Sequence, residues 1–133
     1  MERLPSAHGS RIYRILVVED NLDAVHTTCI LLRELGHAVE YAVNGYVALE
    51  VARRFKPDIV FLDVGLPGVD GFDVCRQIRR DPELMNTRIA MLTAYDSPRM
   101  REMGSEAGCD FYFVKPLDPT RLTELVGDLG APR

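Results

Sequence analysis

Five short apolar segments alternate with five amphipathic segments along the chain, and this alternation constrains the fold more than any other feature of the sequence. Short apolar runs between turn residues are typical of strands, whereas apolar residues three or four apart are typical of helices. Repeated strand–helix units form parallel sheets through right-handed crossovers, which place helices on both faces. The sequence therefore predicts an α/β fold with a five-stranded parallel sheet.

The predicted strands are short and rich in branched apolar residues. The third is a continuous apolar run, as expected of a strand that is covered on both faces. The five ranges are 12–18, 38–43, 59–62, 89–92 and 111–114.

Each predicted helix begins or ends at a residue that is typical of a helix terminus. Asn21 precedes a stripe formed by Leu22, Val25, Cys29 and Leu32, and Gly36 ends that helix. Further helix signals and apolar faces are spread along the rest of the chain. They are Asn44 with Val47, Ala48, Val51, Phe55 and Pro57; Asp81-Pro82 after Val74, Cys75 and Ile78; Ser97-Pro98 before Met100 and Met103; and Asp118-Pro119 before Leu122, Leu125, Val126 and Leu129.

The chain has 133 residues, a length that accommodates one domain. Residues 1–10 contain proline, charged residues and histidine but no apolar run, so we expect a loose leader and not a secretory signal. The domain is expected to span residues 11–130.

The charge balance and the cysteines limit the possible partners and location. With 16 Lys and Arg against 20 Asp and Glu, the formal charge is −4, which argues against binding to nucleic acid or to an anionic membrane surface. No apolar run approaches the roughly 20 residues of a membrane span. Cys29, Cys75 and Cys109 are odd in number and far apart, so we interpret them as buried thiols of a protein in the reducing cytoplasm.

Charged and hydroxyl side chains follow four of the predicted strands. Glu19 and Asp20 follow the first strand, Asp63 the third, Thr93 the fourth and Lys115 the fifth. Ligands of such sheets bind at the carboxyl ends of the strands, where the strand order reverses. Each residue alone is more often a solvated turn or a helix cap, but their joint placement indicates a shared site.

The chemistry expected of this group is phosphoryl transfer assisted by magnesium. Clustered carboxylates repel one another unless a cation lies among them, and Mg²⁺ prefers oxygen ligands. A carboxylate such as Asp63 can act as a nucleophile toward phosphorus. Lys115 and Thr93 are placed to interact with the phosphoryl oxygens.

Four sequence runs together resemble the receiver domain of two-component response regulators. They are ILVVEDN at 15–21, DVGLPGVDG at 63–71, Thr93-Ala94 and Lys115-Pro116. The resemblance covers residues 12–129 in order and spacing. It implies a flavodoxin-like (βα)5 fold with strand order 2-1-3-4-5.

The resemblance also implies roles for the acidic residues. Asp63 is the expected phosphoacceptor, and Glu19 and Asp20 are the expected magnesium-binding pair. Asp63 and the backbone carbonyl of Gly65 are the further expected magnesium ligands.

A second group is implied to bind the phosphoryl group and to respond to it. Thr93 is expected to donate a hydrogen bond to a phosphoryl oxygen, and Lys115 to pair with it. The Lys115-Pro116 bond is expected to be cis. Tyr112 matches the switch aromatic of the family, although an ordinary half-buried strand tyrosine explains it equally well.

The implied function is signalling and not metabolism. The phosphodonor is expected to be a sensor histidine kinase or a histidine phosphotransfer protein, and the chain is expected to catalyse only its own phosphorylation and dephosphorylation. The face formed by the fourth helix, fifth strand and fifth helix is expected to bind an unknown downstream protein. The resemblance also allows a homodimer that forms on phosphorylation.

Two other functions remain open from the residues alone. A magnesium-dependent phosphohydrolase would use Asp63 as its nucleophile, but Gly65 stands where a general acid would be expected. A flavodoxin-like cofactor binder is disfavoured, because acidic strand ends repel a phosphate. Gly65 and Tyr95 are less typical of the resembled family, and together they are expected to alter how water reaches an acyl phosphate.

Overall fold

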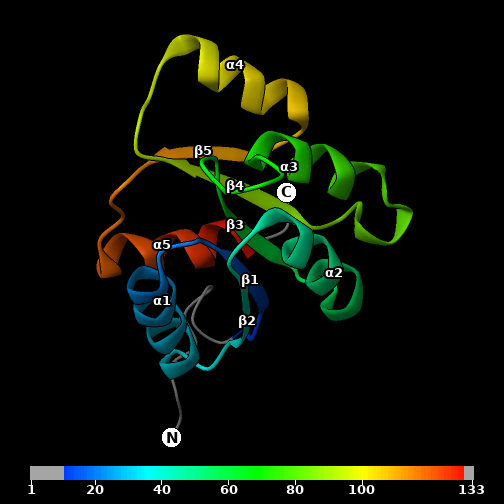
Figure 1. The fold of residues 1–133 in the computed structure, drawn as a ribbon. Coiled ribbons are helices and arrows are strands. Elements are labelled where there is room, and N and C mark those ends of the chain that lie inside the picture. Colours follow the sequence, from blue (N-terminus) through cyan, green and yellow to red (C-terminus); the bar gives the residue numbers. More distant parts are fainter. Residues whose placement is uncertain (1–10, 131–133) are drawn as a thin grey trace, which may run out of the picture.

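Five parallel strands form the central sheet of the computed structural model, which describes residues 11–130 (Figure 1). Their order is β2-β1-β3-β4-β5, and every adjacent pair is parallel. The predicted fold class and strand order are therefore confirmed, whereas the predicted leader lies outside the described residues. The strands are β1 (Arg14–Val18), β2 (Ala38–Ala42), β3 (Ile59–Asp63), β4 (Arg88–Thr93) and β5 (Phe111–Val114).

Helices cover both faces of the sheet (Figure 1). Helices α1 and α5 pack on one face, whereas α2, α3 and α4 pack on the other. A short 3-10 helix, η1, follows α3. The bounds are α1 (Leu22–Glu34), α2 (Gly45–Phe55), α3 (Gly71–Arg80), η1 (Pro82–Leu84), α4 (Pro98–Ala107) and α5 (Pro119–Gly130).

The helices begin where polar side chains cap them. Asn21, Asn44, Ser97 and Asp118 each accept a hydrogen bond from the backbone amide three residues later, at 2.8 to 3.1 Å. These bonds satisfy amides that have no partner within the helix. The four helix starts predicted at these residues are confirmed.

The core consists of two apolar layers, one on each face of the sheet. Alternate strand residues enter opposite layers, as in Leu62 toward α2 and α3 and Phe61 toward α1 and α5. All five residues of β3 are buried. The strand that ends in Asp63 therefore lies at the centre of the protein.

The structure differs from the sequence prediction at the start of β1. The strand begins at Arg14 and not at Ile12, whose side chain is 70% exposed. Tyr13 is buried, and its backbone amide donates to Nδ1 of His37 at 3.1 Å. A side-chain acceptor replaces the strand partner there, so regular pairing starts one residue later.

Several residues that were predicted to face inward are exposed or only partly buried. Phe55, Met100 and Met103 are partly buried against the core, and Leu22, Val47 and Cys109 depart from the prediction for reasons that the structure shows. Leu22 is exposed because it is the first residue of α1, ahead of the buried Val25. Val47 is exposed and Leu49 is buried, so the inward face of α2 lies further along the helix than the sequence predicted. Cys109 is only partly buried, because it lies in the connection that follows α4.

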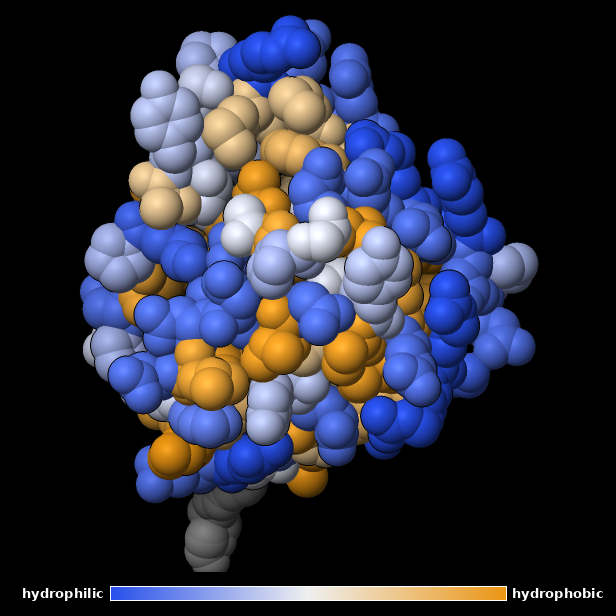
Figure 2. Space-filling model, viewed as in Figure 1, coloured by the Kyte–Doolittle hydropathy of each residue, from blue (hydrophilic) through white to orange (hydrophobic). Residues whose placement is uncertain are grey.

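The outer surface is mostly polar on the face that Figure 2 shows, with apolar side chains interspersed among polar ones. Within the described range 11–130, no helix combines the length and the apolar character that a membrane crossing requires.

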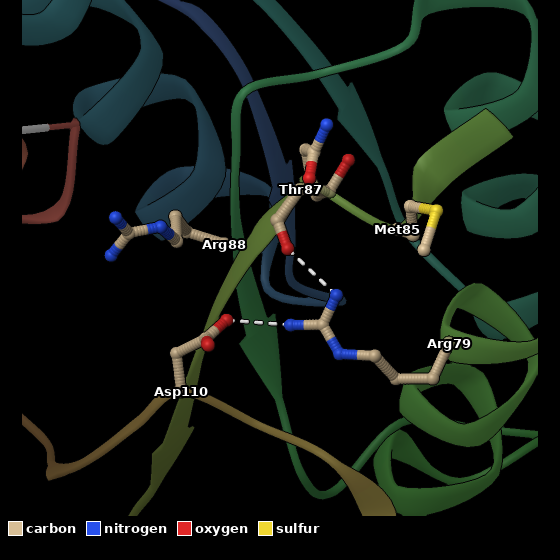
Figure 3. A pocket seen from close by; sticks show the side chains of 6 residues that line it. Arg79, Met85, Thr87, Arg88 and Asp110 are labelled. Carbon is tan, nitrogen blue, oxygen red and sulfur yellow. Dashed lines mark hydrogen bonds and ion pairs between the residues drawn. The ribbon is translucent and has the colours of Figure 1, made fainter. Parts of the chain in front are cut away.

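A polar pocket of about 550 Å³ lies at the amino ends of β4 and β5 (Figure 3). Arg79 extends into it from α3 and donates to the backbone oxygens of Thr87 and Gly108, both at 2.7 Å, and to the Asp110 carboxylate at 2.5 Å. Arg79 thus connects α3 to the segments that lead into β4 and β5. This pocket lies at the opposite end of the sheet from Asp63.

Candidate functional site

The carboxyl ends of β1 and β3 bring three carboxylates together. Glu19 and Asp20 follow β1, and Asp63 ends β3, the strand next to β1. One carboxylate oxygen from each residue lies within 4.8 Å of the other two. In the sheet, β1 has β2 on one side and β3 on the other, and the chain crosses over β1 when it passes from β2 to β3. The cluster therefore occupies the point where the strand order reverses.

Two of the three carboxylates are shielded from water. Asp63 is 7% exposed and Glu19 is 9% exposed, whereas Asp20 is exposed. Burial raises the pKa of Asp63, and the negative charge of Glu19 raises it further. The charge of Lys115 and a hydrogen bond from the Gly65 amide, at 3.2 Å from Oδ1, act in the opposite direction.

Lys115 supplies positive charge from the end of β5. Its Nζ lies 2.9 Å from Oε1 of Glu19 and 3.5 Å from Oδ2 of Asp63. Burial by itself would lower the pKa of Lys115, but the hydrogen bond with Glu19 and the negative charge of Asp63 outweigh burial and raise that pKa. The Lys115-Pro116 peptide is cis, as the family resemblance implied.

The Glu19 carboxylate is also held by the main chain. Its Oε2 accepts a hydrogen bond from the backbone amide of Asn21 at 3.1 Å, while Oε1 accepts from Lys115. Both oxygens are thereby oriented. Sequence reasoning missed the Asn21 amide, and no sequence signal reveals it, because any residue except proline carries that donor.

The Thr93 hydroxyl is buried at the end of β4 and is occupied by its own turn. Oγ1 donates to the backbone oxygen of Tyr95 at 2.8 Å and accepts from the Tyr95 amide at 3.1 Å. Thr93 is 4% exposed. Its hydroxyl therefore lies among the strand ends, as the sequence predicted, but bonds to Tyr95.

Glycines allow the connection between β3 and α3 to pass close to Asp63. A Cβ atom on Gly71 would lie 2.6 Å from the Asp63 carbonyl oxygen and 2.8 Å from the Cα of Val64. At Gly65 a Cβ would meet nothing within 4 Å, so this residue leaves open space beside the acidic cluster. The packing role of Gly71 was not predicted from the sequence.

The Tyr112 ring packs against α4. A Cβ on Gly104 would lie only 3.1 Å from Cδ2 of Tyr112, and the Arg101 guanidinium lies 5.2 Å from the ring centroid. Burial raises the pKa of Tyr112, and Thr93 opposes this effect. The buried hydroxyl nevertheless has no hydrogen bond of normal geometry to any described residue.

The oxygen ligands available here fit a small, hard cation. Magnesium binds one or two carboxylates and retains several waters, and the cluster offers a carboxylate from each of Glu19, Asp20 and Asp63. Because Asp20 is exposed, a hydrated cation can approach the cluster from solvent. The same carboxylates interact with a single lysine, Lys115, in the described part of the chain, so they retain net negative charge for a cation.

Comparisons with known proteins agree with this geometry. A family model, the response regulator receiver domain, matches residues 15–127. The transcriptional regulatory protein AfsQ1 of Streptomyces coelicolor is 43% identical over 104 residues, which are 77% of this chain and 44% of AfsQ1. The chain thus spans less than half the length of that relative.

Two solved structures show the same fold over nearly the whole chain. The chemotaxis protein CheY4 of Vibrio cholerae has a TM-score of 0.85 and 28% identity, and the match covers 90% of this chain and 99% of that one. The receiver domain of the sensor histidine kinase PA1611 of Pseudomonas aeruginosa has a TM-score of 0.81 and 30% identity, covering 91% and 100%. That structure contains a magnesium ion coordinated in its active site cleft.

Proposed function

The chain belongs to the response regulator receiver family, whose members are phosphoacceptors in two-component signalling rather than classical enzymes, and from this we propose that Asp63 is its phosphoacceptor. The observation that carries the proposal is the position of Asp63. It ends the central strand, is 7% exposed, and has a carboxylate oxygen within 4.8 Å of oxygens of Glu19 and Asp20. We take residues 11–130 as the receiver domain.

In the proposed reaction, a carboxylate oxygen of Asp63 attacks the phosphorus of a phosphohistidine on the donor. The new O–P bond forms as the P–N bond breaks, and the imidazole nitrogen leaves with the electron pair. Lys115, already 3.5 Å from Asp63, pairs with the phosphoryl oxygens. The Thr93 hydroxyl breaks its hydrogen bond to the Tyr95 carbonyl and donates a hydrogen bond to one of these oxygens instead.

The acidic cluster is the proposed magnesium site. Glu19, Asp20 and Asp63, with the backbone carbonyl of Gly65, would hold the ion. Mg²⁺ offsets the charge of the phosphoryl oxygens when it is bound. The fit of the carboxylate cluster to a hard cation and the magnesium in the PA1611 receiver domain support this assignment.

The proposed response to phosphorylation involves Thr93 and Tyr112. Movement of Thr93 toward the phosphoryl group would change the space next to Tyr112, and the face formed by α4, β5 and α5 would change shape. An unidentified downstream protein, or a second copy of the phosphorylated chain, would bind this face. The acidic composition favours these partners over direct binding to nucleic acid, and we place the chain in the cytoplasm.

The proposed donors are sensor histidine kinases and histidine phosphotransfer proteins, the partners of receiver domains in general.

The experiment that tests this proposal incubates the chain with a panel of phosphorylated kinases and phosphotransfer proteins, with and without EDTA. Wild type is expected to acquire label from at least one donor in Mg²⁺, whereas Asp63→Asn and Asp63→Ala acquire none. Label on either variant, or equal labelling in EDTA, would contradict the proposal.

A further inference from the structure

Arg101 connects the segment before α4 with its own helix. Its Nε donates to Oδ1 of Asp96 at 2.9 Å, and its Nη2 donates to Oδ2 at 3.0 Å. Such a pair of parallel hydrogen bonds fixes the orientation of both groups, which a single contact does not. Asp96 is therefore held against the first turns of α4.

The same guanidinium contacts β5. It lies 5.2 Å from the ring centroid of Tyr112, within the range of a cation–π interaction. Gly104, three residues after Arg101, lets the ring approach the helix closely. Arg101 thus interacts at once with the β4–α4 connection and with Tyr112.

These contacts bear on Thr93 because Asp96 directly follows Tyr95. Both Tyr95 backbone groups are hydrogen-bonded to the Thr93 hydroxyl, which is then unable to donate its hydrogen elsewhere. For Thr93 to bond to a phosphoryl group on Asp63, its bond to the Tyr95 carbonyl must break. Contacts that fix residues 95 and 96 therefore oppose that change.

We propose that Arg101 is a positioning residue that stabilises the unphosphorylated arrangement of residues 93–96. This inference rests on the proposed function, since it assigns Arg101 an effect on phosphoryl binding at Asp63. The Arg101 side chain is 51% exposed and that of Asp96 is 35% exposed, so their ion pair is only partly shielded. An exposed bidentate pair together with a cation–π contact corresponds to about a three- to tenfold shift in the equilibrium between the two arrangements.

The test uses beryllofluoride, a non-transferable mimic of the phosphoryl group, titrated in Mg²⁺. Arg101→Gln and Asp96→Asn are each expected to bind it about three to ten times more tightly than wild type. The double variant is expected to add little to Arg101→Gln, because Arg101→Gln already removes both the ion pair with Asp96 and the contact with Tyr112, whereas Asp96→Asn removes only the ion pair. Arg101→Lys keeps the charge near Tyr112 but loses the paired geometry, so an intermediate affinity is expected.

The matched control is Arg76→Gln. Arg76 forms an ion pair of similar exposure with Asp73 on α3, and within the described part of the chain no hydrogen bond or ion pair joins Arg76 to residues 93–96. Its affinity for beryllofluoride is expected to equal that of wild type. Arg101→Gln affinities that equal those of Arg76→Gln, or fall below them, would overturn the inference.

A second measurement needs no phosphoryl mimic and so separates this inference from the proposed function. The Tyr95 amide is hydrogen-bonded to Thr93, and its hydrogen exchange is expected to be faster in Arg101→Gln than in wild type or Arg76→Gln. Unchanged Tyr95 exchange overturns the role of Arg101. Faster exchange in a protein that binds no beryllofluoride supports the positioning role and contradicts the proposed function alone.

Discussion

Among the individual residues of the site, Lys115 offsets the negative charge of the neighbouring carboxylates. Its amine interacts with Glu19 and Asp63, two carboxylates that are largely buried. Removing one member of such a cluster leaves the others buried without their partner, which costs free energy. Lys115 and the proposed magnesium ion would therefore both offset the negative charge of the same carboxylates.

We expect Lys115→Ala to lower the free energy of unfolding by about 1–3 kcal/mol in EDTA, because Glu19 and Asp63 lose their ion pair. Added Mg²⁺ is expected to stabilise the variant more than wild type, since the cluster then carries more net negative charge. Urea denaturation at several Mg²⁺ concentrations measures both effects. An equal response of the two proteins to Mg²⁺ would refute the prediction.

The hydroxyl of Tyr112 is predicted to lower the stability of the folded protein, because it is buried without a well-formed hydrogen bond to any described residue. Tyr112→Phe is therefore expected to leave stability unchanged or raise it by up to about 1 kcal/mol. Chemical denaturation beside Tyr46→Phe, which alters an exposed ring, provides the comparison. A loss of more than 1 kcal/mol in Tyr112→Phe would show that the hydroxyl has a partner.

His37 is predicted to make stability depend on pH. Burial lowers the pKa of His37, and its Nδ1 must be unprotonated to accept from the Tyr13 amide. As the pH falls below about 6.5, the unfolded histidine takes up a proton more readily than the folded one. The free energy of unfolding is therefore expected to fall between pH 7 and pH 5, by at most about 1.4 kcal/mol per pH unit from this group.

The surroundings of His37 contain a further positive charge, because Arg11 lies over the Tyr13 ring that stacks on the imidazole. His37→Gln is expected to be less stable at pH 7 but to show a shallower decrease on acidification than wild type. His26→Gln, which replaces an exposed histidine, is the control. Parallel pH profiles for wild type and His37→Gln would contradict this account.

The individual elements could be predicted well where the signal lay in the residue itself. Asn44 and Ser97 begin helices because a side-chain acceptor is needed there, and that requirement is legible in sequence. The prediction for α2 was wrong at Val47. Packing against neighbouring helices, and not hydrophobicity alone, determines which residues of that helix are buried. The Arg101 contacts were missed for a similar reason, since side-chain pairing depends on distances that only the fold defines.

Arg79 is predicted to stabilise the packing of α3 against the segments that lead into β4 and β5. Its guanidinium binds Thr87, Gly108 and Asp110 at the amino ends of β4 and β5, as Figure 3 shows for Thr87 and Asp110. Arg79→Ala is expected to lower the free energy of unfolding by about 3 kcal/mol, because it leaves a largely buried carboxylate and two carbonyls without this donor. Urea denaturation tests this.

Arg80→Ala is the matched control, because Arg80 is the next residue of α3 and is exposed. It is expected to change stability by less than about 0.5 kcal/mol. Equal stability losses in the two variants would argue against the specific role of Arg79.

For the molecule as a whole, the alternation of strands and helices was sufficient to predict where a site would lie. Parallel strands place their carboxyl ends at one edge, so Glu19, Asp20 and Asp63 meet whatever the details of their rotamers. The pairing of Thr93 with Tyr95 was beyond sequence reasoning, because a hydroxyl can rotate between several acceptors. The roles of these residues in phosphoryl transfer stay predictions.

The burial of β3 has a mechanical consequence. Asp63 is attached to a strand with a neighbour on each side and helices above and below, so its backbone is among the least compliant parts of the protein. Tyr112, in contrast, belongs to a partly exposed strand at the margin of the sheet. The proposed phosphorylation of Asp63 would thus take place on a rigid part of the protein, and the proposed shape change would be confined to the edge of the sheet, where rearrangement disrupts fewer neighbours.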